Sequence, residues 1–505
     1  MSLLGVDIGT TGCKASIFTL EGRLLAQSYE EYDVQRPQPG WAELNVVEVW
    51  EKVKRTITRA AIASDEPVTA LAISSMGEAV VPVTKERHIL GPSLLNFDVR
   101  GEEYLPGLAS RLENETLYRI NGNTLANHFT LTKMKWIKQY QPGLYSATDY
   151  FLHWSGFIAF MLGAEPYTDY SLANRSLLFD LDSRDWSAEL LDWAGLDREK
   201  LPDTVQAGVL IGQISPQVAD ELDLPRGIRI VSGAHDQCTN ATGCGVISEG
   251  QALYGMGTYN CVAPVFNRRR GLQEMIACGL NTEHHAVPGC FVSFIYNMGG
   301  AIVKWYRDTY AAAEHRQARA NGKDVYTDLF AELGPEPSPV LVYPHFNDTG
   351  FPVFLPDSRG MILGVSLETR RADILKGILE ANVFSLKQAV DALPGLGIQV
   401  DEFRASGGGS KSDMGLQICA DILGRRFVRP AVSEAGTLGA AILAGAAVGQ
   451  FTSLSRAVEE MVRLEKAFEP DAARHSIYRT RYDQYSRLRP LFGEFLQQVR
   501  RFSTI

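Results

Sequence analysis

The sequence predicts an α/β protein of two domains, in which mixed sheets are flanked by helices and a cleft lies between the domains. The chain has 505 residues, which is enough for two large α/β domains. Its opening residues predict the order strand, strand, strand, helix, strand, which begins a mixed sheet and differs from the uniform alternation of a parallel fold. A strand, a glycine- and threonine-rich tip and another strand recur in the second half. We therefore predict one architecture repeated over residues 1–247 and 248–505.

Hydrophobic periodicity defines the elements of the first half. Apolar or alternating runs predict strands over residues 3–8, 15–18, 24–32, 70–74, 80–83 and 229–232. Apolar residues at helical spacing predict a helix over 46–63, and residues 102–198 are mainly helical, with proline and glycine breaks. The last strand ends in the polar cluster Gly-Ala-His-Asp-Gln at 233–237.

The second half follows the same rules. Strands are predicted over 251–254, 259–265 and 403–406, and helices over 371–393, 412–423 and 436–448. The helix over 436–448 is small and apolar on nearly all sides, so we expect it to be buried.

Composition excludes several classes of protein. Lys and Arg number 49 against 59 Asp and Glu, a net charge of −10 that argues against partners bound through a general basic field, such as nucleic acid or anionic membrane. No apolar run approaches 18 residues and no signal-peptide pattern opens the chain, which favours a cytoplasmic protein. The seven cysteines lack a C-x-x-C pair, so we expect reduced thiols rather than zinc ligands or a disulfide framework.

The first hairpin tip, Asp7-Ile-Gly-Thr-Thr, has the chemistry of a phosphate site. Its backbone N–H groups and the hydroxyls of Thr10 and Thr11 can donate to phosphate oxygens, and Asp7 can hold Mg²⁺ directly or through water. Lys14 lies just beyond the tip and can reach a transferring phosphoryl group. One such tip is as often an ordinary turn, but a second at Gly257-Thr258 favours a clamp on nucleotide phosphates from both domains. This is the arrangement of the actin-like, ribonuclease H-like ATPase fold.

A glycine run at 407–409 lies between a predicted strand and a predicted helix. Such a run allows close backbone approach to a base or an α-phosphate, although it is often only a tight connection. It is neither a P-loop nor a dinucleotide fingerprint, because G-x-x-x-x-G-K-[ST] and G-x-G-x-x-G are both absent here.

Six ordered segments, covering essentially the whole chain, resemble motifs of the FGGY carbohydrate kinases, a family that includes glycerol kinases and xylulokinases. They are D-I-G-T-T at 7–11, F-T-L-T-K-M-K-W at 129–136, G-A-H-D-Q at 233–237, G-M-G-T at 255–258, W-Y-R-D at 305–308, and the stretch from 407 to 449. The resemblance implies an ATP- and Mg²⁺-dependent kinase that phosphorylates a hydroxyl of a small ketose or polyol, pentulose-like in size. It also leaves a homodimer open, although no segment identifies an interface.

The resemblance assigns roles residue by residue. Asp236 matches the general base; a carboxylate is an intrinsically weak base, but positioning matters more than basicity in a loose phosphoryl transition state. Asp7 matches the magnesium-associated aspartate. Phosphate-facing positions match Thr10, Thr11, Lys14, Gly257, Thr258 and Gly300, and the adenosine pocket matches Gly408, Gly409 and Ser412.

The substrate positions depart from the family pattern. Gly77 replaces the arginine of the glycerol-kinase Arg-Glu pair, which removes a planar donor fork and frees volume. Asn96 replaces the tryptophan usual in pentulose kinases, which removes an apolar wall and adds hydrogen-bonding capacity. Both changes predict an acceptor longer or more hydroxylated than glycerol. The residues assigned to it are Glu78, Asp98, Arg100, His128 and Gln237.

Two other functions remain open at this point. An actin-like scaffold or heat-shock-type ATPase would use the same fold, but it needs no sugar-hydroxyl base such as Asp236. A catalytically weak homologue that only senses sugar would keep the fold, and the presence of Asp7, Lys14 and Asp236 argues against it.

Overall fold

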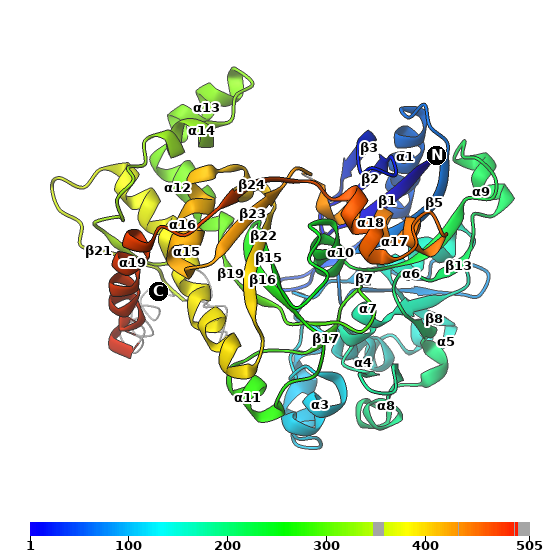
Figure 1. Cartoon of the computed structure of the whole chain (residues 1–505). Coiled ribbons are helices and arrows are strands. Elements are labelled where there is room, and N and C mark those ends of the chain that lie inside the picture. The colour runs from blue at the N-terminus through cyan, green and yellow to red at the C-terminus, as the bar shows by residue number, and fades with distance from the viewer. Residues whose placement is uncertain (347–357, 433, 489, 493–505) are drawn as a thin grey trace.

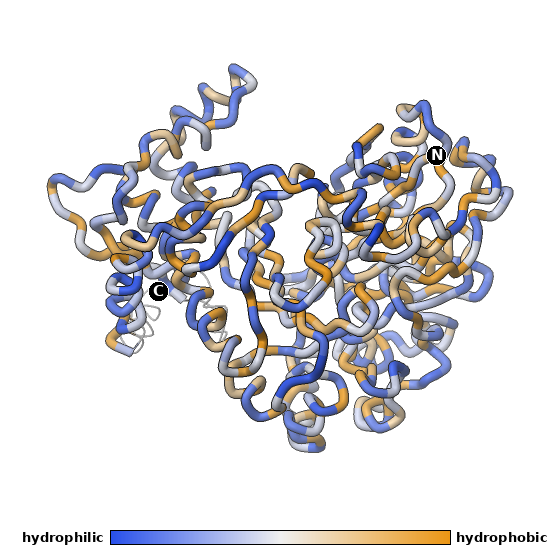
Figure 2. The backbone as a smooth tube through the Cα atoms, in the orientation of Figure 1, coloured by the Kyte–Doolittle hydropathy of each residue, from blue (hydrophilic) through white to orange (hydrophobic). Residues whose placement is uncertain are grey.

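A computed structural model describes residues 1–346, 358–432, 434–488 and 490–492. Figure 1 shows two α/β bodies side by side, each built around a large sheet. In Figure 2, hydrophobic positions recur along the strands of both sheets, where their side chains form separate cores. The expected fold class, two actin-like domains with mixed sheets and flanking helices, is confirmed.

The first sheet is six-stranded and mixed, with the order β13-β14-β5-β1-β2-β3. Its strands are β1 Ser2–Ile8, β2 Gly12–Phe18, β3 Leu24–Glu31, β5 Val68–Ser75, β13 Leu210–Gln213 and β14 Arg229–His235. β1, β2 and β3 form an antiparallel meander, whereas β5 is parallel to both β1 and β14. Helix α1, Val46–Ile62, begins where the Asn45 side chain accepts a hydrogen bond from Glu48 N (3.2 Å), and its apolar face packs on β2 and β3.

The second sheet repeats this plan with eight strands. They are β15 Gly250–Met256, β16 Tyr259–Phe266, β17 Glu283–His284, β18 Phe291–Val292, β19 Ile295–Met298, β22 Val400–Ser406, β23 Arg426–Pro430 and β24 Leu464–Phe468. The β15–β16 hairpin is antiparallel and β22 runs parallel to β15, as β5 does to β1. The flanking helices are α11 Leu272–Ala277, α12 Gly300–Tyr310, α13 Ala312–Ala320, α14 Val325–Ala331, α15 Arg371–Ala392, α16 Asp413–Leu423 and α19 Ala472–Ser486.

The mainly helical segment of the first half forms its own hydrophobic cluster beside the first sheet. Its helices are α2 Leu105–Ala109, α3 Asn114–Asn121, α4 Thr130–Tyr140, α5 Pro142–Ala147, α7 Tyr170–Asn174 and α8 Ala188–Ala194. Helix α6, Trp154–Leu162, instead packs on β5 and β14 and belongs to the core of the first sheet. Strand β6, Val80–Val83, pairs with β8, Tyr150–His153, in a two-stranded sheet separate from the first sheet. Small two-stranded pairs complete the fold: β4 Glu43–Leu44 with β7 Ser93–Leu94, β9 Tyr167–Asp169 with β12 Asp203–Val205, β10 Phe179–Asp180 with β11 Asp185–Trp186, and β20 Leu341–Tyr343 with β21 Met361–Leu363. Across the described residues, no helix is both long enough and apolar enough to span a membrane.

The helix expected to be buried, α17 (Ala435–Ala447), is buried, but it lies on the first sheet. Figure 1 shows α17 and α18 (Leu454–Met461) beside β1 and β5 of the first body. α17 also packs along α10, Asp236–Gly243. A helix from the second half of the chain therefore packs onto the first body. The division of the chain into domains at 247/248 remains a prediction.

Glycines make this packing close enough for backbone to touch backbone. A Cβ on Gly439 would lie 1.9 Å from Thr239 O, and one on Gly243 would lie 1.8 Å from Ala435 O. Beneath α17, a Cβ on Gly5 of β1 would lie 1.8 Å from Thr437 O. Any side chain at these positions would force the helices and the sheet apart.

We predict that Gly439→Ala lowers the free energy of unfolding by about 1–3 kcal/mol, because the added methyl group has no room between α10 and α17. Thermal and urea unfolding of the full chain measure the loss. Gly143→Ala in α5 is the matched control: no atom lies within 4 Å of its Cβ position, so it should be neutral or stabilising. Equal stability of Gly439→Ala and the wild type would contradict the close contact.

Candidate active site

The site lies where three parallel strands of the first sheet end. Asp7 on β1 pairs in register with Ser74 on β5, and His235 on β14 pairs with Ser75. Because parallel strands bring their carboxyl ends to one edge, Asp7 and Asp236 lie at the same edge, which is where open α/β sheets bind ligands.

Asp7 is a half-buried carboxylate, and only one of its two oxygens accepts a hydrogen bond from the described residues. Ser74 Oγ donates to Asp7 Oδ1 at 2.6 Å, while Oδ2 takes no hydrogen bond from the described residues. Burial raises the pKa of Asp7, and the Ser74 hydrogen bond and Lys14 oppose the rise. The start of α17 lies close by, since a Cβ on Gly436 would be 3.6 Å from the carboxylate.

Lys14 connects this edge to the second half of the chain. Its ammonium forms an ion pair with Glu434, the residue that precedes α17. Lys14 therefore has to exchange a carboxylate for a phosphate oxygen if it is to contact the transferring group. No motif or spacing in the sequence singles out Glu434.

Asp236 stands in the first turn of α10 with the properties of a proton acceptor. Burial, followed by repulsion from the Asp7 and Glu78 carboxylates, raises the pKa of Asp236 to about 7. The side chain keeps 34% of its surface exposed, so a substrate hydroxyl can reach it. His235 Nε2 lies 3.2 Å from Asp236 Oδ1, and burial lowers the pKa of His235 well below its usual value, so the imidazole is neutral.

Glu78 occupies a strained turn. Its φ is 62°, and Ala79 N donates to Gly77 O at 2.7 Å, which closes a three-residue γ-turn around Glu78. A non-glycine residue in this region costs stability and is typical of functional sites. Burial raises the pKa of Glu78 from its usual value, against the opposing effect of Arg175.

Arg175, which follows α7, supplies the guanidinium that Gly77 lacks. Its Nε donates to Glu78 Oε1 at 2.7 Å and its Nη1 to Glu283 Oε1 at 2.7 Å. A Cβ on Gly77 would lie 3.0 Å from His235 Nε2 and 3.4 Å from Arg175 Cγ. The expectation that Gly77 removes a donor fork and frees volume is therefore wrong, because another element fills the space with the same group.

The remaining predicted acceptor residues around Glu78 differ in their contacts. Asn96 Nδ2 approaches Glu78 Oε2 at 3.4 Å. Burial and the nearby Arg175 lower the pKa of His128 to about 3, so that ring is neutral. The Gln237 side chain makes no hydrogen bond with the described residues, and it lies next to Asp236. Acceptor contacts for Glu78, His128 and Gln237 stay predictions.

Asp98 and Arg100 instead bind each other, which corrects their assignment to the acceptor. Asp98 Oδ2 accepts from Ala42 N and from Arg100 Nη2, both at 2.6 Å, and Arg100 Nη2 also donates to Glu43 at 2.6 Å. The guanidinium stacks on Trp41, 4.0 Å from the ring centroid. The pair is buried, and its charged groups bind other groups of the protein. Asp98 and Arg100 therefore support the loop that carries Asn96.

Both predicted phosphate tips are tight and held from behind. In the first, Tyr32 OH donates to Gly9 O at 2.5 Å, which leaves Thr10 and Thr11 at the bend. In the second, Gly300 N at the start of α12 donates to Gly257 O at 2.9 Å. A Cβ on Gly300 would lie 2.4 Å from that oxygen, so Gly300 holds the tip, while Gly257 and Thr258 are exposed.

The glycine run lies against the second tip. Gly407 has a φ of 86°, and a Cβ on Gly409 would lie 2.9 Å from Met256 Cβ, beside the tip. The Cβ position of Gly408 meets no atom within 4 Å, so its backbone is open to a flat ligand. Ser412 Oγ accepts from Gly415 N at 3.0 Å and caps α16, while its O–H remains available as a donor, so its adenosine contact also stays a prediction. Nucleotide contacts by Gly408 and Gly409 stay predictions.

The donor set fits Mg²⁺. In the described ranges, no three metal-ligating side chains come together. Mg²⁺ does not need such a cage, because it is held by one or two carboxylates together with substrate phosphates and water. Asp7, with Oδ2 free beside the first tip, matches that requirement, and Asp236 lies close enough to act on it electrostatically.

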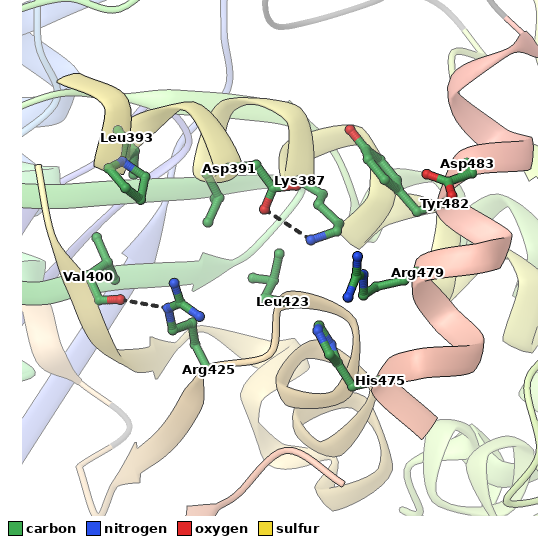
Figure 3. Close-up of a pocket in the computed structure, with 12 residues that line it drawn as sticks. Lys387, Asp391, Leu393, Val400, Leu423, Arg425, His475, Arg479, Tyr482 and Asp483 are labelled. Atoms are coloured by element: carbon green, nitrogen blue, oxygen red, sulfur yellow. Dashed lines mark hydrogen bonds and ion pairs between the residues drawn. The ribbon is translucent and has the colours of Figure 1, made fainter. Parts of the chain in front are cut away.

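A pocket of about 450 Å³ lies apart from these residues. Figure 3 shows it between α15, the turn after α16 and α19, with Lys387 bonded to Asp391 on one side and Arg479 on the other. None of the predicted site residues lines it, so it is separate from the predicted reaction site.

Two repeated α/β domains, with paired hairpin tips and a reachable carboxylate at a strand end, define an actin-like phosphotransferase. Residues 2–243 match the N-terminal domain of the FGGY family of carbohydrate kinases, and residues 267–448 match its C-terminal domain. The chain belongs to this family, whose members are sugar and polyol phosphotransferases that use ATP with Mg²⁺. The family assignment does not favour a scaffold or heat-shock-type ATPase.

Relatives share the whole length but differ in their named substrates. The chain is 29% identical to a glycerol kinase of Albidiferax ferrireducens, covering 93% of this chain and 95% of that one. It is 24% identical to a xylulose kinase of Bacillus subtilis, covering 96% of each. A ligand-bound xylulose kinase from Lactobacillus acidophilus has the same fold, with a TM-score of 0.88 at 20% identity over 99% of both chains.

We predict that kcat/KM rises with pH through about 7 and levels off above it, because only deprotonated Asp236 accepts a proton. Asp236→Asn should lower turnover by about 10²–10⁴-fold and leave nucleotide affinity nearly unchanged. A pH profile and a nucleotide titration of both proteins check this.

Stability gives an independent readout of the same residue. The folded-state pKa of Asp236 lies above its ordinary value, so the wild type loses stability as pH rises through about 7. Asp236→Asn should therefore unfold at a higher temperature than the wild type above pH 7. Asp220→Asn, in an exposed surface ion pair with Arg226, is the control and should change neither property. An active, less stable Asp236→Asn protein would overturn the assignment.

Proposed function

We propose that the protein transfers the γ-phosphoryl group of ATP to a hydroxyl of a neutral ketose or polyol of four to six carbons, pentulose-like in size. The observation that carries the proposal is Asp236, a reachable carboxylate with a pKa of about 7 between Asp7 and the Glu78–Arg175 pair. This position fits a base that meets a sugar hydroxyl on one side and phosphate on the other.

The chemistry follows from these residues. Asp236 accepts the proton of the substrate hydroxyl as that oxygen forms a bond to the γ-phosphorus, and the bond to the β–γ bridging oxygen breaks to release ADP. Mg²⁺ held at Asp7 would neutralise charge on the phosphate oxygens. Lys14 leaves Glu434 to pair with the transferring group, and the tips at 10–11 and 257–258 fix the phosphates.

The size of the acceptor follows from the number of polar side chains around Asp236, although Glu78 already accepts hydrogen bonds from Arg175 and Asn96. Glu78, Asn96 and Gln237 offer donors and acceptors beside Asp236, more than a three-carbon triol can satisfy together with the reacting hydroxyl. A site with buried polar partners discriminates against substrates that leave those partners unpaired. Glycerol is therefore expected to be a poor acceptor.

A coupled ADP-release screen over four- to seven-carbon polyols and ketoses tests the proposal. We predict at least one four- to six-carbon ketose or alditol with a kcat/KM about tenfold or more above that of glycerol. Asp236→Asn is the control that separates transfer to sugar from background hydrolysis. Efficient use of glycerol with every longer acceptor poorer would refute the size assignment, and no turnover of any neutral acceptor would refute the function.

A further inference from the structure

One buried ion cluster joins the two halves of the chain at the acceptor site. Arg175 binds Glu78 of the first half and Glu283 on β17 of the second sheet. The side chains of Arg175, Glu78 and Glu283 are only 12%, 6% and 1% exposed. All three charges are therefore largely removed from water.

The cluster is poorly explained as a stabilising element. It holds two carboxylates against one guanidinium, and burying charges is costly even when they are paired. Glu283 Oε1 accepts from Arg175 and from Asn281 Nδ2 at 2.6 Å, but the buried Glu283 Oε2 has no hydrogen-bond partner among the described residues. A buried carboxylate oxygen without a partner calls for a ligand or another explanation.

The cluster also lies beside the reacting group. Arg175 stacks over Phe129 at 5.0 Å and Phe294 at 6.0 Å from the ring centroids, and Phe294 contacts the His235 ring, which borders Asp236. Arg175 and Glu78 are near enough to Asp236 to shift its pKa. The cluster therefore forms a wall of the proposed acceptor site, with Glu283 entering from the second domain.

We propose that Arg175 and Glu283 are specificity-determining residues which, with Glu78, make the site select neutral polyhydroxylated acceptors over those that carry a carboxylate. The inference rests on the proposed function, because it concerns the acceptor of that reaction. Glu283 Oε2 accepts a hydrogen bond from an acceptor hydroxyl, and Arg175 holds both carboxylates in place with its fork.

Charge supplies the selectivity. The cluster carries one net negative charge, and Asp236 and Asp7 add to it, while the neighbouring His128 and His235 are neutral. A sugar acid would place its carboxylate against these groups, and the Arg175 guanidinium could not neutralise it because it is already bound on both sides. A ketose or alditol meets no such repulsion.

The first test is Glu283→Gln, which keeps the shape and removes one charge. The kcat/KM of the best neutral acceptor is divided by that of the aldonate with the same number of carbons. We expect this ratio to fall at least tenfold in the variant, with the KM for ATP unchanged. Glu314→Gln, which also removes a carboxylate from an arginine pair but lies on α13, is the matched control and should keep the wild-type ratio.

The second test is Arg175→Lys, which keeps the charge and loses the fork. We expect the KM for the neutral acceptor to rise about tenfold with a smaller change in kcat, and calorimetry without nucleotide to show the same loss of affinity. If Glu283→Gln does not fold, this variant decides the proposal. If the wild type phosphorylates neutral acceptors, an unchanged acceptor ratio in Glu283→Gln or an unchanged acceptor affinity in Arg175→Lys overturns this specificity proposal. If the wild type phosphorylates no neutral acceptor, the proposed function itself is refuted.

Discussion

The backbone contact between α10 and α17 is the constraint on which the site depends. Gly243 and Gly439 let the two helices approach until carbonyl oxygens occupy the space of missing side chains. The contact brings a helix of the second half onto β1 and β5. α10 begins with Asp236, and α17 begins beside Asp7 and Lys14, so one helix pair positions the predicted base, the predicted metal ligand and the lysine in a single layer.

The raised pKa values in this layer have one physical cause: several carboxylates lie close together where little water reaches them. Burial raises the pKa values of Asp7, Glu78 and Asp236, and repulsion from the first two carboxylates adds to the rise that brings the pKa of Asp236 to about 7. A carboxylate with a pKa near neutrality is a far better proton acceptor than an exposed one. The same excess of negative charge suits a site that takes up Mg²⁺ with nucleotide phosphates and a neutral acceptor.

The two sheets share a plan but carry different chemistry. The first hairpin holds Asp7 and leads to the base through β14, whereas the corresponding tip of the second sheet offers only backbone and a threonine hydroxyl beside the glycine run. This asymmetry supports an acceptor site on the first domain and a nucleotide site on the second. Arg175 and Glu283 form an ion pair across this division, so the proposed acceptor site includes a residue of the second domain.

Local features of the sequence were enough to predict much of the fold and the candidate base, Asp236. The strands around both tips, the helices α1, α15 and α16, and the burial of α17 follow from periodicity and composition, which need no knowledge of distant residues. Asp236 was identified because its motif is contiguous. Only the tertiary structure decided that α17 lies on the first sheet and that β6 pairs with β8 outside that sheet, because both depend on which surfaces meet.

The acceptor site depended most on tertiary structure. Arg175 and Glu283 are 108 positions apart, and no spacing rule links them, so neither could be singled out before the domains were placed together. Gly77 suggested an empty space because the sequence shows which side chain is missing at a position, but not which neighbour fills the room. Asp98 and Arg100 matched a substrate motif in type and spacing, yet packing against Trp41 and Glu43 turned them inward. Sequence determines the chemistry available, and the pairing of buried charges across distant segments decides which of it faces the ligand.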